Sequence, residues 1–157
     1  MNYVYLILIY YFMWPPYSKQ TKIFLVIVCL LLSVLGFMVK LPSVFRHWDK
    51  ELHSAFYFLA AAFLNILFTN KRVSIHVFIF IILFLFGVSI EYAQEYSNKL
   101  LHTTIHGRFD REDVLSNLRG LLAFSVLWIA YRGSVFVYKK VTANPSPSPD
   151  RNVGGSN

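Results

Sequence analysis

The sequence predicts an all-α, polytopic membrane protein built as a bundle of four transmembrane helices. The chain has 157 residues, of which 56% are hydrophobic and 15% are charged, and its mean hydropathy is +0.49. Soluble domains usually carry about a quarter charged residues, so a water-soluble globule is excluded. The apolar residues fall into four long runs, and none of these alternates polar with apolar residues, which favours helices over a β-barrel.

Three of the four runs contain no Lys, Arg, Asp or Glu. They cover residues 23–39, 52–70 and 73–90, which are 17, 19 and 18 residues long. The fourth run, 114–131, has 18 residues, and its one charge, Arg119, lies near its start, where a long side chain can reach the headgroups. Each run is close to the roughly 17 to 25 residues that cross the hydrocarbon layer, so each predicts one spanning helix.

Two polar residues interrupt these spans, and both are interpreted as structural. We expect Asn65 in the second span to hydrogen-bond to another helix. His76 in the third span is expected to be packed and hydrogen-bonded rather than to bind a ligand. The single cysteine, Cys29, excludes an internal disulfide and a thiolate metal site.

The two ends of the chain differ in composition from the membrane domain, which we place at residues 22–137. Residues 1–21 are expected to form an interfacial or leader segment, because the apolar start is too short to span and Pro15 and Pro16 end any helix there. An alternative start at Met13 would give a short basic leader. Residues 138–157 become rich in Pro, Ser, Gly and Asn, which predicts a disordered cytoplasmic tail.

The basic residues indicate how the chain is inserted. If both termini lie on one side, that side holds eight Lys and Arg residues near the spans and the opposite side holds six. Lys and Arg are enriched on the cytoplasmic side, so we expect both termini in the cytoplasm. The same bias accounts for the net charge of +7, and we therefore expect the lipid bilayer, and no nucleic acid, as the partner of this basic chain.

The titratable residues gather on the other side of the membrane. Four spans in alternating directions place the connection between the first two on the same side as the connection between the last two. Seven of the eight acids and four of the five histidines lie there. Polar side chains near hydrocarbon are costly unless they bond to one another inside the bundle, so the pattern predicts a shared polar pocket.

The spacing at three span ends supports this pocket, because residues three or four apart share one face of a helix. The pairs are Asp49 with His53, Glu91 with Gln94, and Asp113 with Asn117. Asp49 could orient the imidazole of His53. A purely structural explanation stays open for the acids at helix starts, because capping and the helix dipole favour acids at N-termini.

These residues resemble the pattern of the VanZ-like family of small bacterial membrane proteins. The matching strings are Asp-Lys-x-x-His at Asp49, Lys50 and His53, Glu-x-x-Gln at Glu91 and Gln94, and an Arg followed by Asp-x-x-x-Asn-x-x-Gly at Arg108, Asp113, Asn117 and Gly120. The resemblance covers about residues 23–131, and Arg119 departs from it. It implies a four-helix protein of the bacterial cytoplasmic membrane that acts in the cell envelope. The name-giving member is associated with reduced susceptibility to teicoplanin-type glycopeptide antibiotics.

The favoured function is that of a protein whose outward-facing pocket binds or modulates an envelope component, either a lipid-linked glycan or a phospholipid headgroup. Lys50 and Arg108 would pair with phosphate or carboxylate groups. The remaining ligand-binding candidates would hydrogen-bond sugar or amide groups or line the pocket. These candidates are Glu91, Gln94, Asp113 and Asn117.

Two alternatives stay open. In an intramembrane enzyme acting on a lipid, His53 would be the general acid or base, Asp49 would orient it and Glu91 would be the second acid or base. A divalent cation held by His53, Glu91 and Asp113 is a variant of that hypothesis. In a structural partner subunit, the polar residues would only hold the helices together. No cofactor and no dedicated metal site is assigned from the sequence.

Overall fold

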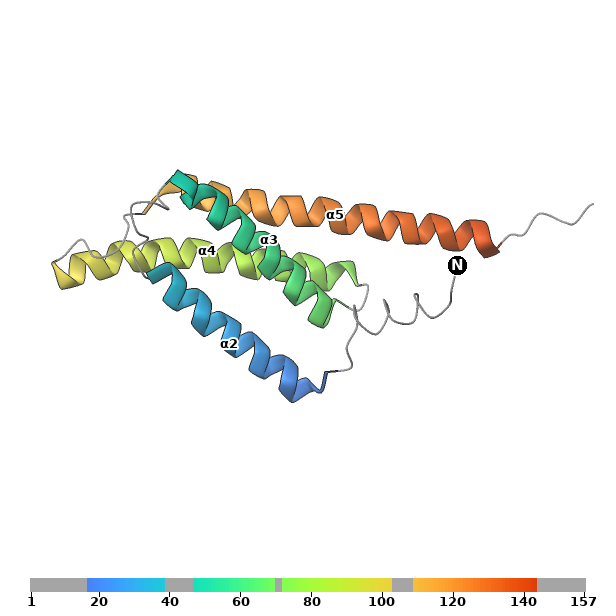
Figure 1. Cartoon of the computed structure of the whole chain (residues 1–157), viewed down its shortest axis with the longest axis horizontal. Coiled ribbons are helices and arrows are strands. Elements are labelled where there is room, and N and C mark those ends of the chain that lie inside the picture. The colour runs from blue at the N-terminus through green and yellow to red at the C-terminus, as the bar shows by residue number, and fades with distance from the viewer. Residues whose placement is uncertain (1–16, 39–46, 70–71, 103–108, 144–157) are drawn as a thin grey trace, which may run out of the picture. The chain divides into compact units, whose positions relative to one another are not determined.

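The described part of the chain is helical. The computed structural model describes residues 17–38, 47–69, 72–102 and 109–143. Within them lie four long helices (Figure 1), namely α2 (Lys19–Met38), α3 (Asp49–Phe68), α4 (Val73–Leu101) and α5 (Arg111–Ala143). All four are long and apolar enough to cross a membrane, which confirms the expected all-α, four-helix membrane fold. The expected interfacial segment lies mostly outside the described residues.

The chain divides into two units, Met1–Phe124 and Ser125–Asn157. The first unit contains α2, α3, α4 and the first turns of α5. The second contains the remainder of α5, which is helical as far as Ala143. Residues 138–143, expected to begin the disordered tail, are therefore helical. They contain neither Pro nor Gly, so no residue in them breaks the helix. The rest of the expected tail lies outside the described residues.

Helix α4 extends eleven residues beyond position 90, where the apolar run ends. A rise of about 1.5 Å per residue makes its 29 residues about 43 Å long, against about 30 Å of hydrocarbon. Its last turns therefore project past the apolar layer. They are supported there by an ion pair between Lys99 Nζ and Glu95 Oε1 at 2.6 Å, one turn apart. The helix ends at His102, whose backbone is left-handed with φ 49°.

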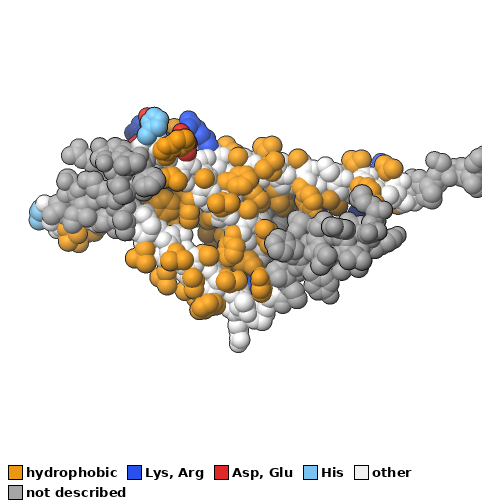
Figure 2. Space-filling model, in the orientation of Figure 1, with side chains coloured by type: hydrophobic (Ala, Val, Ile, Leu, Met, Phe, Trp, Pro, Cys, Tyr) orange, Lys and Arg blue, Asp and Glu red, His pale blue; other side chains and the backbone are white. Residues whose placement is uncertain are grey.

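The interior of the first unit is formed mainly by α3 and α4. The buried apolar residues that pack together there are Tyr57, Ala61, Ile79, Leu83 and Leu121. Most other apolar side chains are exposed, as Figure 2 shows for one face, which is the arrangement expected where lipid rather than water surrounds the helices. On the same face, charged side chains gather near the beginnings of α3 and α5.

Helix α2 contacts the rest of the first unit mainly near its two ends. Near its beginning, Lys22 Nζ donates to the carbonyl oxygen of Leu67, at the end of α3, over 2.6 Å. At its other end, the Phe37 carbonyl accepts a hydrogen bond from Gln94 Nε2 of α4 at 2.7 Å, and the Phe37 ring lies 5.0 Å from the ring of His53. Helices α2 and α3 therefore run antiparallel, as alternating spans require.

The buried polar residues at the end of α3 satisfy one another. Asn65 Oδ1 accepts hydrogen bonds from Thr69 Oγ1 at 2.6 Å and from His76 Nδ1 of α4 at 2.8 Å. Its amide nitrogen donates to the carbonyl oxygen of Ala61 at 2.7 Å. The predictions that Asn65 hydrogen-bonds to another helix and that His76 is packed and hydrogen-bonded are confirmed.

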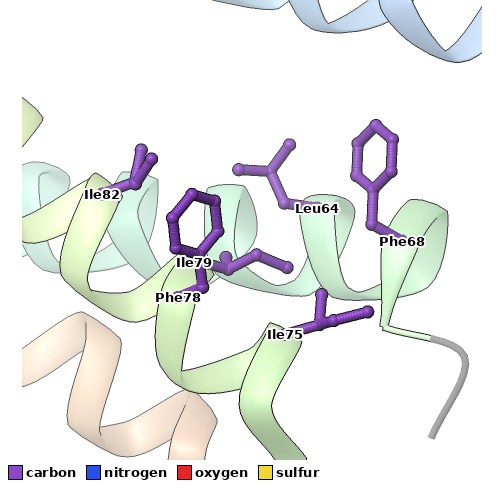
Figure 3. A pocket seen from close by; sticks show the side chains of 6 residues that line it. All are labelled: Leu64, Phe68, Ile75, Phe78, Ile79 and Ile82. Atoms are coloured by element: carbon purple, nitrogen blue, oxygen red, sulfur yellow. The ribbon is translucent and has the colours of Figure 1, made fainter. Parts of the chain in front are cut away.

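An open pocket of about 400 Å³ lies along the facing sides of α3 and α4. Figure 3 shows its lining, which consists of Leu64, Phe68, Ile75, Phe78, Ile79 and Ile82. These side chains contain only carbon and hydrogen, so the pocket suits hydrocarbon and has no group that would recognise a polar ligand.

Candidate functional site

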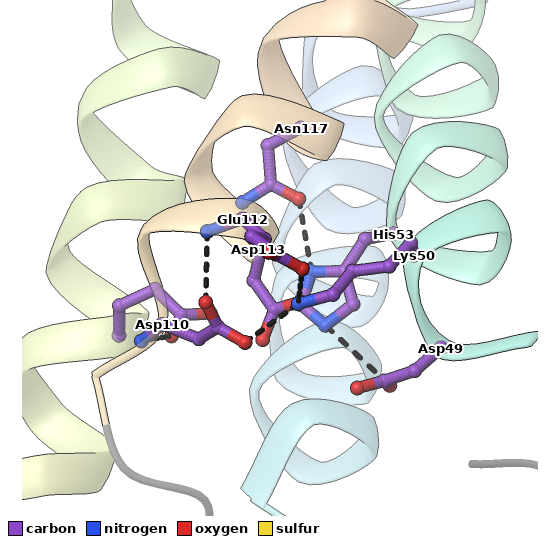
Figure 4. Close-up of polar contacts among 8 residues, drawn as sticks. Asp49, Lys50, His53, Asp110, Glu112, Asp113 and Asn117 are labelled. Atoms are coloured by element: carbon purple, nitrogen blue, oxygen red, sulfur yellow. Dashed lines mark hydrogen bonds and ion pairs between the residues drawn. The ribbon is translucent and has the colours of Figure 1, made fainter. Parts of the chain in front are cut away.

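Polar side chains from three helices meet where α3 and α5 begin. Figure 4 shows most of them pointing toward one another. We call this group the polar cluster. Its members are Asp49, Lys50, His53, Glu91, Asp110, Asp113 and Asn117.

Lys50 is the positive centre of the polar cluster. Its Nζ lies 2.6 Å from Asp110 Oδ2 and 2.7 Å from Asp113 Oδ1, and Glu112 Oε2 lies 3.5 Å away at the rim. An ammonium group has three donors, and hydrogen bonds to Asp110 and Asp113 use two of them. The expected pairing of Lys50 with a ligand anion would have to compete with these contacts.

Asp110 joins the start of α5 to α3. It is the residue before the helix, and its Oδ1 accepts the backbone N–H of Glu112 at 2.8 Å, which is an N-cap. Its other oxygen accepts from Lys50, and this hydrogen bond lowers the pKa of the Asp110 carboxyl below its ordinary value. Asp110 therefore stays ionised, and paired with Lys50, throughout the physiological pH range.

His53 is buried, with 8% of its surface exposed, and Asn117 fixes its ring. The ring Nδ1 lies 2.9 Å from Asn117 Oδ1. Asp49 lies on the same face of α3, as expected, but its Oδ1 is 3.9 Å from His53 Nε2, which exceeds hydrogen-bond distance. The residue that orients the imidazole is thus Asn117, across the helix interface, rather than Asp49.

Glu91 is the most deeply buried acid of the polar cluster, with 1% of its surface exposed. Its Oε2 accepts the backbone N–H of Asp110 at 3.2 Å. Gln94, one turn further along α4, instead donates to the Phe37 carbonyl, and no hydrogen bond among the described residues links it to the cluster. Arg108, the other predicted ligand-binding residue, lies outside the described residues.

Two glycines let the helices approach closely enough for these contacts. A Cβ at Gly120 of α5 would overlap the carbonyl oxygen of Ser54 on α3. A Cβ at Gly87 of α4 would lie 2.8 Å from Tyr57 Oη and 2.9 Å from Asn117 Nδ2, closer than side chains tolerate. Small residues at these crossings are typical of membrane helix packing.

The structure adds residues that the sequence prediction did not include. Asp110 and Glu112 were counted among the acids of this side but not assigned to the site, although both contact Lys50. The signal that could have identified Asp110 is its place as a capping acid three residues before Asp113, which puts two carboxylates at one helix start.

The fold and the polar cluster define a multi-pass membrane protein with a buried, mainly acidic site at one end of its helices. No protein-family model, curated protein or solved structure matches the chain. The resemblance to the VanZ-like family stays a prediction.

Proposed function

We propose that this chain is a VanZ-like protein of the bacterial cytoplasmic membrane that binds the headgroup of an envelope lipid or lipid-linked glycan at the polar cluster. The observation that carries the proposal is the meeting of buried His53, Glu91 and Asn117 near the starts of α3 and α5, where the apolar run of α4 ends. Helix ends lie at the depth of lipid headgroups, and polar groups buried there are functional candidates by default. A change in teicoplanin susceptibility upon expression would be the cellular consequence of such binding.

The charges of the cluster indicate which headgroup chemistry it would recognise. Among the described residues, the cluster has four acids and one ammonium group, and Asp110, Asp113 and Glu112 already engage that ammonium. Carboxylates accept hydrogen bonds and do not donate them. The cluster therefore suits the hydroxyl, amide N–H and ammonium donors of a sugar or amino headgroup better than a bare phosphate.

Retention of a sugar-bearing lipid by the purified full-length protein would test this proposal. Native mass spectrometry would compare a polyprenyl-diphosphate-linked disaccharide with the same polyprenyl diphosphate lacking sugar. We expect preferential retention of the sugar-bearing lipid, and a loss of about tenfold for Asp49→Asn, because a carboxylate acceptor is worth about 1.5 kcal/mol or more.

The matched control for this experiment is Glu95→Gln, which removes an acid of α4 that pairs with Lys99 outside the cluster. It should retain the lipid as the unmodified protein does. Equal retention of both lipids, or unchanged retention by Asp49→Asn, would contradict the proposal. An enzyme would instead release a modified lipid and lose turnover in His53→Ala.

We also propose that both termini lie in the cytoplasm, so that the cluster faces outward. Single cysteines at Trp48→Cys, before α3, and Thr142→Cys, near the end of α5, would be placed in a Cys29→Ser background; both positions are exposed. A membrane-impermeant maleimide added to intact cells should label position 48, and should label position 142 only after permeabilisation. Labelling of position 142 in intact cells, with position 48 labelled only after permeabilisation, would place both termini outside the cytoplasm.

A further inference from the structure

Three groups of the polar cluster lie close enough together to hold a metal ion. One ligand atom each from Asp49, His53 and Asp113 lies within 4.8 Å of the others. Asp49 and His53 come from adjacent turns of α3, and Asp113 comes from the first turn of α5, so the site joins two helices (Figure 4). Two carboxylate oxygens and one imidazole nitrogen are ligand atoms that bind divalent cations.

The orientation of His53 points independently to a ligand. Its Nδ1 is the atom that contacts the Asn117 oxygen, so in the neutral ring the proton is on Nδ1 and Nε2 carries a lone pair. Nε2 is directed at Asp49 Oδ1, 3.9 Å away, and makes no hydrogen bond to any described residue. A buried lone pair facing a carboxylate is unfavourable unless a proton or a metal cation lies between them, and the ¹⁵N NMR measurement below distinguishes the two.

The hydrogen bond between His53 Nδ1 and Asn117 Oδ1 is of the kind that holds a metal-binding histidine in place. Histidines that bind metals usually donate their other ring nitrogen to a carboxylate, carbonyl or water, which fixes the tautomer and directs the lone pair at the metal. Asn117, with 2% of its surface exposed, supplies such an acceptor to His53. The supporting contact therefore exists before any ion binds.

The charge balance also favours a cation. Within the described residues of the cluster, four carboxyl groups face the one ammonium group of Lys50, and a carboxylate that is buried without a cation, as at Glu91 or Asp113, is costly. Lys50 occupies one acceptor site of Asp113, whereas a carboxylate has about four. Asp113 can therefore bind Lys50 and an ion together.

We propose that Asp49, His53 and Asp113 bind a divalent first-row transition metal ion, Zn²⁺ or Mn²⁺. Ligand distances of about 2.0 to 2.2 Å place two donors at most about 4.4 Å apart, so the 3.9 Å separation of His53 Nε2 and Asp49 Oδ1 accommodates an ion. Asp49 is partly exposed and can rotate to close the remaining gap. The imidazole nitrogen favours Zn²⁺ over Mg²⁺ and Ca²⁺, and the two carboxylates also suit Mn²⁺.

This site differs from the cation variant considered from the sequence, in which Glu91 was the third ligand. Glu91 instead accepts the backbone N–H of Asp110. Asp49 takes its place because it lies one turn before His53 on the same helix. The ion needs no lipid, so metal binding is measured separately from lipid retention, although both proposals involve Asp49.

The test uses the full-length protein in detergent, stripped with a chelator, incubated with ZnCl₂ or MnCl₂ and desalted. We expect one metal ion per chain by elemental analysis, and ¹⁴N coupling to bound Mn²⁺ in pulsed electron paramagnetic resonance. His53→Gln should lose the coupling. Asp49→Asn should keep it but weaken Zn²⁺ binding at least about tenfold. His47→Gln, which removes an exposed histidine six residues away, should bind as the unmodified protein does.

Other results would overturn the proposal. Absence of bound metal after desalting is one, and ¹⁴N coupling that persists in His53→Gln is another. Because His53→Gln alters a buried residue, Asp49→Asn, at a partly exposed first helical position, is the variant that keeps the fold; unchanged Zn²⁺ affinity in it would exclude this ligand set. A His53 ring shown by ¹⁵N NMR to carry protons on both nitrogens at neutral pH in the presence of Zn²⁺ would exclude it as well.

Discussion

The substitution Gly120→Val is expected to force α5 away from α3 and to destabilise the protein by about 3 kcal/mol, the upper part of the range for overpacked interiors. Even a Cβ at this position overlaps the Ser54 carbonyl oxygen, which is backbone and cannot move aside by a change of rotamer. Separation of the helices would also break the contact between His53 and Asn117. Equilibrium unfolding in mixed detergent micelles measures the loss.

The control for this prediction is Gly133→Val on the same helix. No described atom lies within 4 Å of a Cβ at Gly133, so the same substitution meets open space. It should change the free energy of unfolding by less than about 1 kcal/mol, in the range of helix propensity. Equal destabilisation by the two variants would show that propensity, rather than close packing at position 120, causes the effect.

The second large effect is expected for Lys50→Met, which removes the cation from between Asp110 and Asp113. Breaking a buried ion pair by removing one partner costs roughly 3 to 5 kcal/mol, because the other charge stays buried. The Lys50 side chain is 30% exposed, so we expect a smaller loss, about 2 kcal/mol. Thermal unfolding at neutral pH checks this value.

Neutralising the carboxylates should restore part of the stability lost in Lys50→Met. In the triple variant Lys50→Met, Asp110→Asn, Asp113→Asn, no uncompensated charge remains at these positions, so unfolding should occur at a higher temperature than in Lys50→Met alone. If the triple variant were less stable than Lys50→Met, charge imbalance would not be the cause of the loss.

The helices of this protein could be predicted because the bilayer imposes a simple requirement. A run of about 20 apolar residues without charge has to form a helix there, since no other single-segment structure satisfies its backbone in hydrocarbon. Each run has one described helix over most of its length, and α3 ends at Phe68, just before the end of the second run. The ends were less predictable, because α4 and α5 continue past their apolar runs. Outside hydrocarbon a helix can continue where no residue breaks it and where pairs such as Glu95 with Lys99 stabilise it.

The site was predictable in outline for a related reason. Alternating spans require the starts of α3 and α5 to lie on one side, so the grouping of their polar residues follows from the order of the spans. The partners within the group did not follow. Asp110 was counted only as one more acid of that side, because its role depends on the reach of Lys50 across the helix interface.

The sequence by itself determined the number of spans, their helical state and the gathering of the titratable residues on one side of the bundle, because these depend on hydrophobic length and chain order alone. Only the tertiary structure decided that Asn117 orients His53, that Gln94 binds the end of α2 and that Asp49 shares a donor set with Asp113. Those contacts depend on the rotation and separation of the helices. Close packing at Gly87 and Gly120 sets the rotation and separation of the helices. This packing involves residues of different helices, so the residue pattern along a single helix does not predict it.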